Sequence, residues 1–265
     1  MKKKLRITAF SDIHGYLDKD LKDQSGDLLL ICGDILPLDC QRDDIEAHSW
    51  MCNKFFPWLH GLHYKKKIFI AGNHDFLLYN MMTDRNGQHR KPSRVKFKLA
   101  YGIWDDMTDI TYLQDSGLDY EGYHIWGMPW IEDLTRWAFY TKDLGQYTKK
   151  MPKNLDILMT HMPPRVLSYG TSLDLTGIPN YGSQVLADAV LAEKKPRFHI
   201  FGHVHSGSHI LYKYQNTYFQ NVSWLDEKYQ PTFGPSKFIL DDQEVHVEDS
   251  RADPWDGEGW DPIGI

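Results

Sequence analysis

The sequence is poor in cysteine, and the three that occur form no recognisable pattern. Cys32, Cys40 and Cys52 stand among 265 residues. Their number is odd, and their spacing fits neither a zinc knuckle nor a CxxC redox pair, so a cysteine-ligated zinc site is not expected. A core can form without disulfides in a chain of this length. A reducing, cytoplasmic setting is the simplest expectation.

Long apolar runs are also missing. No stretch of about eighteen apolar residues occurs, so no membrane span is expected. The apolar segment that follows the basic start of the chain, Leu5–Phe10, is interrupted by Arg6 and Thr8. It is too short and too polar for the apolar region of a signal peptide.

An excess of positive charge is the third absence, since the formal net charge is -6. Proteins that capture DNA or RNA through the phosphate backbone are usually basic, so this balance argues against a nucleic-acid partner. A small phosphorylated substrate remains compatible, because metal cations in a site would reverse the local field of the acidic residues. The sequence leaves the oligomeric state open.

Five short apolar runs, each stopped by glycine or a polar residue, are typical of strands buried on both faces. They cover residues 5–10, 27–32, 67–71, 155–160 and 197–201. Helical spacing of apolar residues lies between them at 45–62 and 185–195, the latter ending before Pro196. Strands that alternate with helices in this way indicate an α/β fold.

Other segments predict added antiparallel strands. Short strand-like pieces lie within 111–126, and hairpins are expected at 208–224 and 237–247, with Gln215-Asn216 and Asp241-Asp242 as turns. The prediction is two mixed sheets packed as a sandwich and flanked by helices. One domain at 1–250 is expected, followed by a tail at 251–265 that either packs on the body or stays loose.

The polar residues that follow the five apolar runs are the candidates for chemistry. They are Asp12, His14, Asp34, Asn73, His74, Asp75, His161, His203 and His205. Ligands of open parallel sheets bind at the carboxyl ends of the strands, where five such loops would meet. Carboxylate oxygens and imidazole nitrogens suit Mn, Fe or Zn. Two such ions could share one carboxylate and activate a water as the nucleophile for phosphoester hydrolysis.

The ordered set DxH, GD, GNHD, H and GHxH resembles the calcineurin-like metallophosphoesterase superfamily over residues 8–206. Residues 160–164 and 201–207 and the tyrosine-rich strands that follow are similar to the metallophosphoesterase-domain-containing group, also described as the brain 239FB-type or UPF0046 group. Some members of that group lack the first histidine of GHxH and have weakened activity. This chain has His203 there, so both metal positions are expected to fill.

The resemblance implies a role for each residue and a pair of divalent cations, with Mn favoured and Fe, Zn, Ni or Co as alternatives. It assigns Asp12, His14, Asp34 and His205 to the first metal and Asp34, Asn73, His161 and His203 to the second. Asp34 would bridge the two. Asn73 and His74 would also bind substrate, and His74 would protonate the leaving group. Asp75 would orient His74 through a hydrogen bond.

The expected activity is hydrolysis of a phosphodiester in a small nucleotide-like substrate. A phosphomonoesterase or a phosphoprotein phosphatase is the nearest alternative, and a nuclease is a further one. A non-catalytic interaction module on the same fold is the alternative from another class, but such a module should have lost ligands.

Each motif also has a plain structural interpretation. Asn73 could cap a helix at 76–82. His203 and His205 would point to opposite faces of a regular strand, so the chain must leave strand geometry at Gly202 if both bind metal. The basic segment 85–98 is either a solvated charge run, which we favour, or a flap that attracts substrate.

Several residues outside the motifs are also candidates for a role near the site. Asp39 is expected to be an ordinary loop residue, with support of the metal site as the alternative. Of the other histidines, His209 lies nearest to a motif, but all eight are expected to be surface or packed residues. Trp126, Trp130 and Trp137 fit the core, although one of them could stack on a base.

Overall fold

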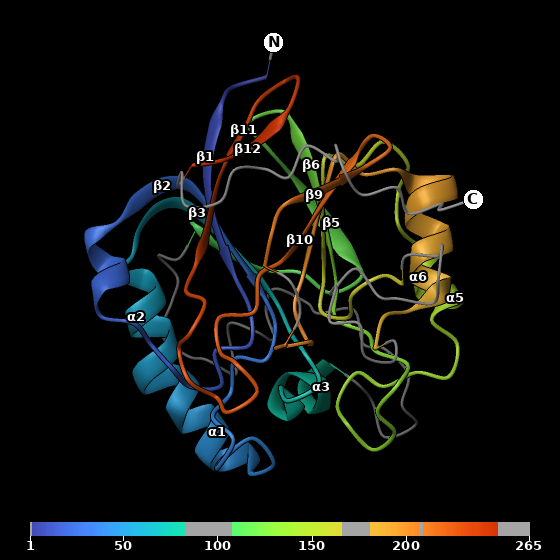
Figure 1. Ribbon diagram of the computed structural model, residues 1–265. Coiled ribbons are helices and arrows are strands. Elements are labelled where there is room, and N and C mark those ends of the chain that lie inside the picture. The colour runs from blue at the N-terminus through green and yellow to red at the C-terminus, as the bar shows by residue number, and fades with distance from the viewer. Residues whose placement is uncertain (1, 83–107, 166–180, 207–208, 249–265) are drawn as a thin grey trace.

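Two six-stranded mixed sheets form the body of the protein in a computed structural model that describes residues 2–82, 108–165, 181–206 and 209–248 (Figure 1). The first sheet has the order β12-β11-β1-β2-β3-β4. Its strands are β1 (Leu5–Phe10), β2 (Ser25–Cys32), β3 (His63–Ile70), β4 (Ile110–Tyr112), β11 (Ser236–Leu240) and β12 (Val245–Val247). Strands β1 to β4 are parallel, while β11 and β12 form an antiparallel hairpin beside β1.

The second sheet repeats this mixture of strand directions. Its order is β5-β6-β7-β8-β10-β9, in which β6, β7, β8 and β10 are parallel and each edge strand is antiparallel. Its strands are β5 (Ser116–Tyr120), β6 (Tyr123–Met128), β7 (Ile157–Thr160), β8 (Phe198–Phe201), β9 (Tyr212–Tyr214) and β10 (Thr217–Asn221). The chain passes from the first sheet to the second between β4 and β5, and it returns between β10 and β11.

Side-chain alternation explains why the central strands are apolar on both faces. Leu28 and Leu30 of β2 join the buried cluster between the sheets, to which Ile157 and Ile200 of the second sheet also contribute. Leu29 points the other way, into the cluster beneath the helices. A strand covered on both sides has no polar face, and this is the origin of the unbroken apolar runs in the sequence.

Helices flank the two sheets on opposite sides of the molecule in Figure 1. On one side α1 (Asp44–Trp50) continues through a π-helical stretch (Met51–Phe55) into α2 (Phe56–His60). On the other lie α5 (Gly145–Thr148) and α6 (Gln184–Asp188), which runs into a π-helical stretch (Ala189–Lys194). The other helical segments within the described ranges are a 3-10 turn (Asp20–Asp23) and α3 (Phe76–Met82). In Figure 1, α3 lies at the lower end of the sandwich.

The predicted fold class is confirmed, including the antiparallel strands beside each parallel set and both hairpins. The predicted helix at 45–62 is present, but it changes register through the π-helical stretch. The basic segment 85–98 and the tail at 251–265 lie outside the described residues. Within the described ranges, no helix has the length and apolar character needed to cross a membrane.

Candidate metal centre

Loops that follow β1, β2, β3, β7 and β8 meet at one edge of the sandwich. Backbone hydrogen bonds join them directly: Asp12 N–H donates to the Gly33 carbonyl (3.0 Å), and His14 N–H donates to the Asp34 carbonyl (3.0 Å). Gly202 N–H donates to the His161 carbonyl (3.1 Å) in the second sheet. The convergence expected from the carboxyl ends of parallel strands is therefore present in space.

Left-handed backbone conformations turn the polar side chains out of the strands. Asp12, His14, Asp34 and His203 have φ of 54°, 40°, 52° and 73°. Non-glycine residues rarely adopt such angles, and clusters of them are found where function demands a particular geometry. The angle at His203 also confirms that the chain leaves strand geometry after Gly202.

Two glycines allow the loops to approach closely. A Cβ atom added to Gly202 would lie 2.1 Å from Ser11 Oγ and 2.3 Å from Asp12 Oδ2. A Cβ atom added to Gly72 would lie 2.3 Å from Asp34 Oδ1. Both glycines are therefore required by the close packing of backbone against the carboxylates of the site.

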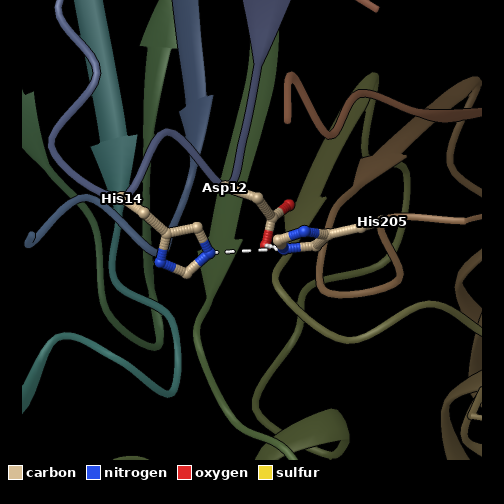
Figure 2. Close-up of side chains that lie close together, drawn as sticks. All are labelled: Asp12, His14 and His205. Carbon is tan, nitrogen blue, oxygen red and sulfur yellow. Dashed lines mark hydrogen bonds and ion pairs between the residues drawn. The ribbon is translucent and has the colours of Figure 1, made fainter. Parts of the chain in front are cut away.

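The first group of donor atoms comes from Asp12, His14 and His205, shown together in Figure 2. His205 Nε2 lies 3.5 Å from Asp12 Oδ1 and 3.3 Å from His14 Nε2. The other oxygen of Asp12 accepts a hydrogen bond from the Ser223 hydroxyl (2.7 Å), and that bond fixes the carboxylate. One carboxylate oxygen and two ring nitrogens thus face a common point.

The second group gathers around the side-chain oxygen of Asn73. His161 Nε2 and His203 Nδ1 each lie 2.8 Å from Asn73 Oδ1. Asp34 Oδ2 connects the two groups, since it lies 3.4 Å from His161 Nε2 and 3.8 Å from His14 Nε2. The carboxylate of Asp34 is therefore placed to serve both groups.

The outer ring nitrogens of three histidines are tied to acceptors. His161 Nδ1 donates to the Cys32 carbonyl (2.9 Å), and His205 Nδ1 donates to the Asp226 carbonyl (2.9 Å). His203 Nε2 donates to the Asp133 carboxylate (3.0 Å). When neutral, as cation binding requires, each of these rings keeps its one proton on the outer nitrogen and presents a lone pair to the centre of the site.

Lone pairs that face one another at these distances repel unless positive charge lies between them. The inner atoms are carboxylate oxygens, an amide oxygen and imidazole nitrogens, a donor set that suits divalent Mn, Fe or Zn. Ligand atoms lie within 4.8 Å of one another in three overlapping groups, namely Asp12, His14 and His205, then His14, Asp34 and His74, and finally Asp12, Asp34 and His161. The residues therefore fit two divalent cations that share Asp34.

A model of the calcineurin-like phosphoesterases matches residues 5–207. The chain belongs to this family. Metallophosphoesterase domain-containing protein 1 of Homo sapiens is 30% identical over 242 residues, which cover 87% of this chain and 69% of that protein. A UPF0046 protein of Caenorhabditis elegans is 28% identical over 239 residues, covering 89% of this chain and 75% of its own.

A solved structure shares the fold of this phosphoesterase. The phosphopantetheinyl hydrolase of Mycobacterium tuberculosis superposes with a TM-score of 0.51 at 14% identity, covering 94% of this chain and 98% of that chain. At that identity the likeness concerns the fold alone. It agrees with the two mixed sheets and flanking helices described above.

Charge in the phosphoesterase site is balanced between buried acids and histidines. Burial opposes ionisation of Asp34, but His161 and His74 outweigh it and hold the pKa of Asp34 well below its usual range. Burial alone would lower the pKa of His161, yet Asp34 raises it to about 10. Protons and divalent cations compete for the same lone pairs, so cation affinity should fall as pH falls.

His74 borders the same centre but differs from the other histidines. Its backbone N–H donates to Asp34 Oδ1 (2.7 Å), and its ring Nε2 lies 3.8 Å from Asp34 Oδ2. Its Nδ1 is buried and has no hydrogen-bond partner among the described residues. Burial lowers the pKa of this imidazole. The ring lines a cavity of about 270 Å³ that opens beside Asp34 and Asn73.

The expected hydrogen bond from Asp75 to His74 was wrong. The Asp75 carboxylate instead accepts three backbone N–H groups, from Ile35 (2.9 Å), Leu36 (3.0 Å) and Gly72 (2.7 Å). Burial and then the charge of Asp34 raise the pKa of Asp75 to about 7. Asp75 thus ties the loop after β2 to the loop after β3, and it acts on the site through backbone position.

Three residues near the centre have no expected part in the metal site, because they do not follow a strand in a recognised motif. Asp133 contacts His203, and the ring of Trp137 lies 4.4 Å from that of His74. The ring of Tyr229 lies 5.0 Å from that of His14. For Trp137 the sequence predicts a core or a stacking role, and its side chain is partly buried beside His74.

The remaining candidates have structural settings. Asp39 is exposed in the loop after β2. His209 stacks on Phe233, with ring centroids 3.7 Å apart, and its Nε2 contacts the His205 carbonyl at 3.4 Å. Trp130 is buried and stacks on Tyr147 at 4.0 Å. None of these side chains is among the donor groups of the described site.

Proposed function

We propose that this phosphoesterase is a dinuclear, metal-dependent phosphodiesterase that acts on a small nucleotide-like substrate. Supporting this is one observation above all: seven motif residues bring their donor atoms to a single centre, with the outer nitrogens of three histidines already hydrogen-bonded. They are Asp12, His14, Asp34, Asn73, His161, His203 and His205. A non-catalytic module would have no need for such an arrangement.

The chemistry divides between the bound cations and the chain. When bound, two divalent cations supply Lewis acidity, which activates a water and neutralises charge on the phosphoryl oxygens. The chain holds the shared carboxylate of Asp34 between the two donor groups and places His74 at the wall of the cavity. His74 would contact the phosphoryl group and, in its imidazolium form, would pass a proton to the departing oxygen and become neutral, which is general acid catalysis. The negative charge of a bound phosphoryl group favours that form.

The lining of the cavity favours a diester over a monoester. Asp133 and Glu227 line it, and no lysine or arginine is among the described residues that do so. A phosphomonoester carries up to two negative charges near neutral pH, whereas a diester carries one. Bound cations would attract both esters, but Asp133 and Glu227, without a nearby cationic side chain, would repel the dianion more strongly than the monoanion.

Turnover of two aryl phosphates tests the proposal. The protein is stripped of metal and loaded with Mn, Fe, Zn, Ni or Co, and its metal content is measured by elemental analysis. We expect bis-(p-nitrophenyl) phosphate to be hydrolysed with a higher kcat/KM than p-nitrophenyl phosphate. A reversed ratio would favour a phosphomonoesterase or a phosphoprotein phosphatase. No turnover of either ester by protein that holds two cations would refute the enzymatic proposal.

Replacement of His74 separates its role from metal binding. In His74→Gln, kcat for the diester should fall by about 10²–10⁴-fold, which is the usual contribution of general acid catalysis. The cation content should remain that of the wild type. Asp39→Asn is the control, because Asp39 is an exposed acid in the loop that carries Asp34. Unchanged turnover in His74→Gln would contradict the role given to this ring.

A further inference from the structure

A loop that the family motifs do not include reaches into the candidate centre. Residues 131–140 follow β6 and are closed by a bridge between Ile131 and Tyr140. Ile131 N–H donates to the Phe139 carbonyl (3.0 Å), which closes the loop from within. Ala138 N–H donates to the carbonyl of Asn73 (3.1 Å), so the loop is attached to the segment that follows β3.

Asp133 of this loop contacts His203. Its Oδ2 lies 3.0 Å from His203 Nε2, and the side chains are 22% and 7% exposed respectively. An ionised carboxylate only accepts hydrogen bonds, so His203 Nε2 must donate. The neutral ring then carries its lone pair on Nδ1, which is the atom 2.8 Å from Asn73 Oδ1.

The hydrogen-bond acceptor of the outer ring nitrogen of His203 is chemically different from the acceptors of His161 and His205. His161 and His205 donate to backbone carbonyls, of Cys32 and Asp226. A carbonyl orients an imidazole, but a carboxylate also makes it a stronger ligand because it stabilises positive charge on the ring. Among these three rings, only that of His203 is held by a side chain.

We propose that Asp133 is a positioning residue that strengthens one of the two cation sites, the one formed by Asp34, Asn73, His161 and His203. It holds His203 in the tautomer that presents Nδ1, and it increases the basicity of that nitrogen. The first site, which contains Asp12, His14 and His205, takes no ligand from the ring of His203; the backbone N–H of His203 donates to Asp12, and that bond does not involve Asp133. This inference rests on the proposed function only in assuming that the chain binds two cations.

Titration of the metal-stripped full chain with Mn²⁺ in a calorimeter tests the proposal. We expect two binding steps in the wild type, and His203→Ala identifies the step that belongs to the second site. In Asp133→Ala that same step should weaken by about 10–100-fold, as is typical when the hydrogen-bond partner of a metal ligand is removed. Asp133→Asn should weaken it less, because the amide oxygen can still accept from Nε2. The other step should keep its affinity in both variants.

A matched control separates position from net charge. Glu132→Gln removes one negative charge from the neighbouring position of the same loop, and both steps should remain as in the wild type. The tautomer supplies a second measurement: ¹⁵N NMR of the metal-stripped protein should show the His203 proton on Nε2, and Asp133→Ala should shift it toward a mixture.

The outcomes distinguish this inference from the proposed function. Wild-type affinity at both steps in Asp133→Ala would overturn the role of Asp133, even in an active enzyme. An equal loss in Glu132→Gln would reduce the effect to net charge and would overturn it as well. A protein that binds two Mn²⁺ with the predicted difference but hydrolyses no phosphoester would keep this inference and refute the proposed activity. Failure of the wild type to bind Mn²⁺ would overturn both.

Discussion

His199 offers a quantitative test of the packing beneath the site. It lies on β8 and is fully buried, and its Nε2 donates to Thr160 Oγ1 (2.8 Å). The Thr160 hydroxyl in turn donates to the Met162 carbonyl (2.6 Å), so this chain of bonds fixes the loop that carries His161. The other nitrogen, Nδ1, has no partner among the described residues. Burial lowers the pKa of His199 to about 3.

The pH dependence follows from the difference between folded and unfolded states. In the unfolded chain this histidine should titrate near pH 6.5, whereas the folded protein keeps it neutral down to about pH 3. Between these values the unfolded state binds one more proton, so the free energy of unfolding falls as the pH falls. At about 1.4 kcal/mol per pH unit, the loss between pH 6.5 and pH 4 is about 3 kcal/mol. Above pH 6.5 His199 contributes no pH dependence.

Urea denaturation of His199→Gln and the wild type from pH 4 to pH 8 measures this effect. Glutamine has no charge to lose and can still donate to Thr160. Both proteins are stripped of metal, and the wild-type free energy minus that of the variant cancels the titration of the other histidines. The exposed His63, at the start of β3, supplies the comparison variant His63→Gln.

The difference in unfolding free energy should be constant above about pH 7 and should then fall by about 3 kcal/mol toward pH 4. The slope should correspond to one proton. A difference that stays flat over the whole range would show that folded His199 accepts a proton, and the account of its burial would then be wrong.

Two further predictions concern the centre itself. Gly202→Ala should lower the free energy of unfolding by about 1–3 kcal/mol and reduce cation content, because its new methyl group overlaps the Asp12 carboxylate; urea denaturation and elemental analysis measure both. Gly61→Ala is the control, since its Cβ meets neighbours only at 3.4 Å, and equal effects in the two variants would contradict the close approach. Asp34→Asn should lower turnover more than His74→Gln and reduce binding in both calorimetric steps; loss of one step alone would show that Asp34 is not shared.

The central strands, their sequence along the chain and the loops that end them could be predicted, because runs of neighbouring apolar residues and the polar residues after them mark these features. Strand β1 begins and ends where its apolar run does. Strands β2 and β3 begin earlier than predicted, at Ser25 and His63, because these polar residues pair with each other without an apolar pattern to mark them. The π-helical stretch after α1 likewise has no sequence signal that we recognised.

The motif residues were found because parallel strands bring their ends together whatever lies between them in the chain. Asp133 and Tyr229 reach the same centre from loops between elements, and nothing in their own sequence neighbourhood indicates the contact. The error over Asp75 has a similar origin. Adjacency in sequence suggested a bond to His74, but the carboxylate points back to three backbone N–H groups. Contacts that depend on the path of a loop in space could not be derived from the spacing of residues in the sequence.

The backbone strain at the centre shows how the scaffold contributes to the shape of the site. Four donor residues adopt left-handed conformations, and each costs about 1–2 kcal/mol for an L-residue. Two features of the scaffold offset this cost. The strands before the loops are paired and buried. In addition, the Asp75 carboxylate and the outer nitrogens of His161 and His205 are hydrogen-bonded to the backbone. It follows that residues that hold the ligands, such as Asp133 and Gly202, should control cation affinity as much as the ligands themselves.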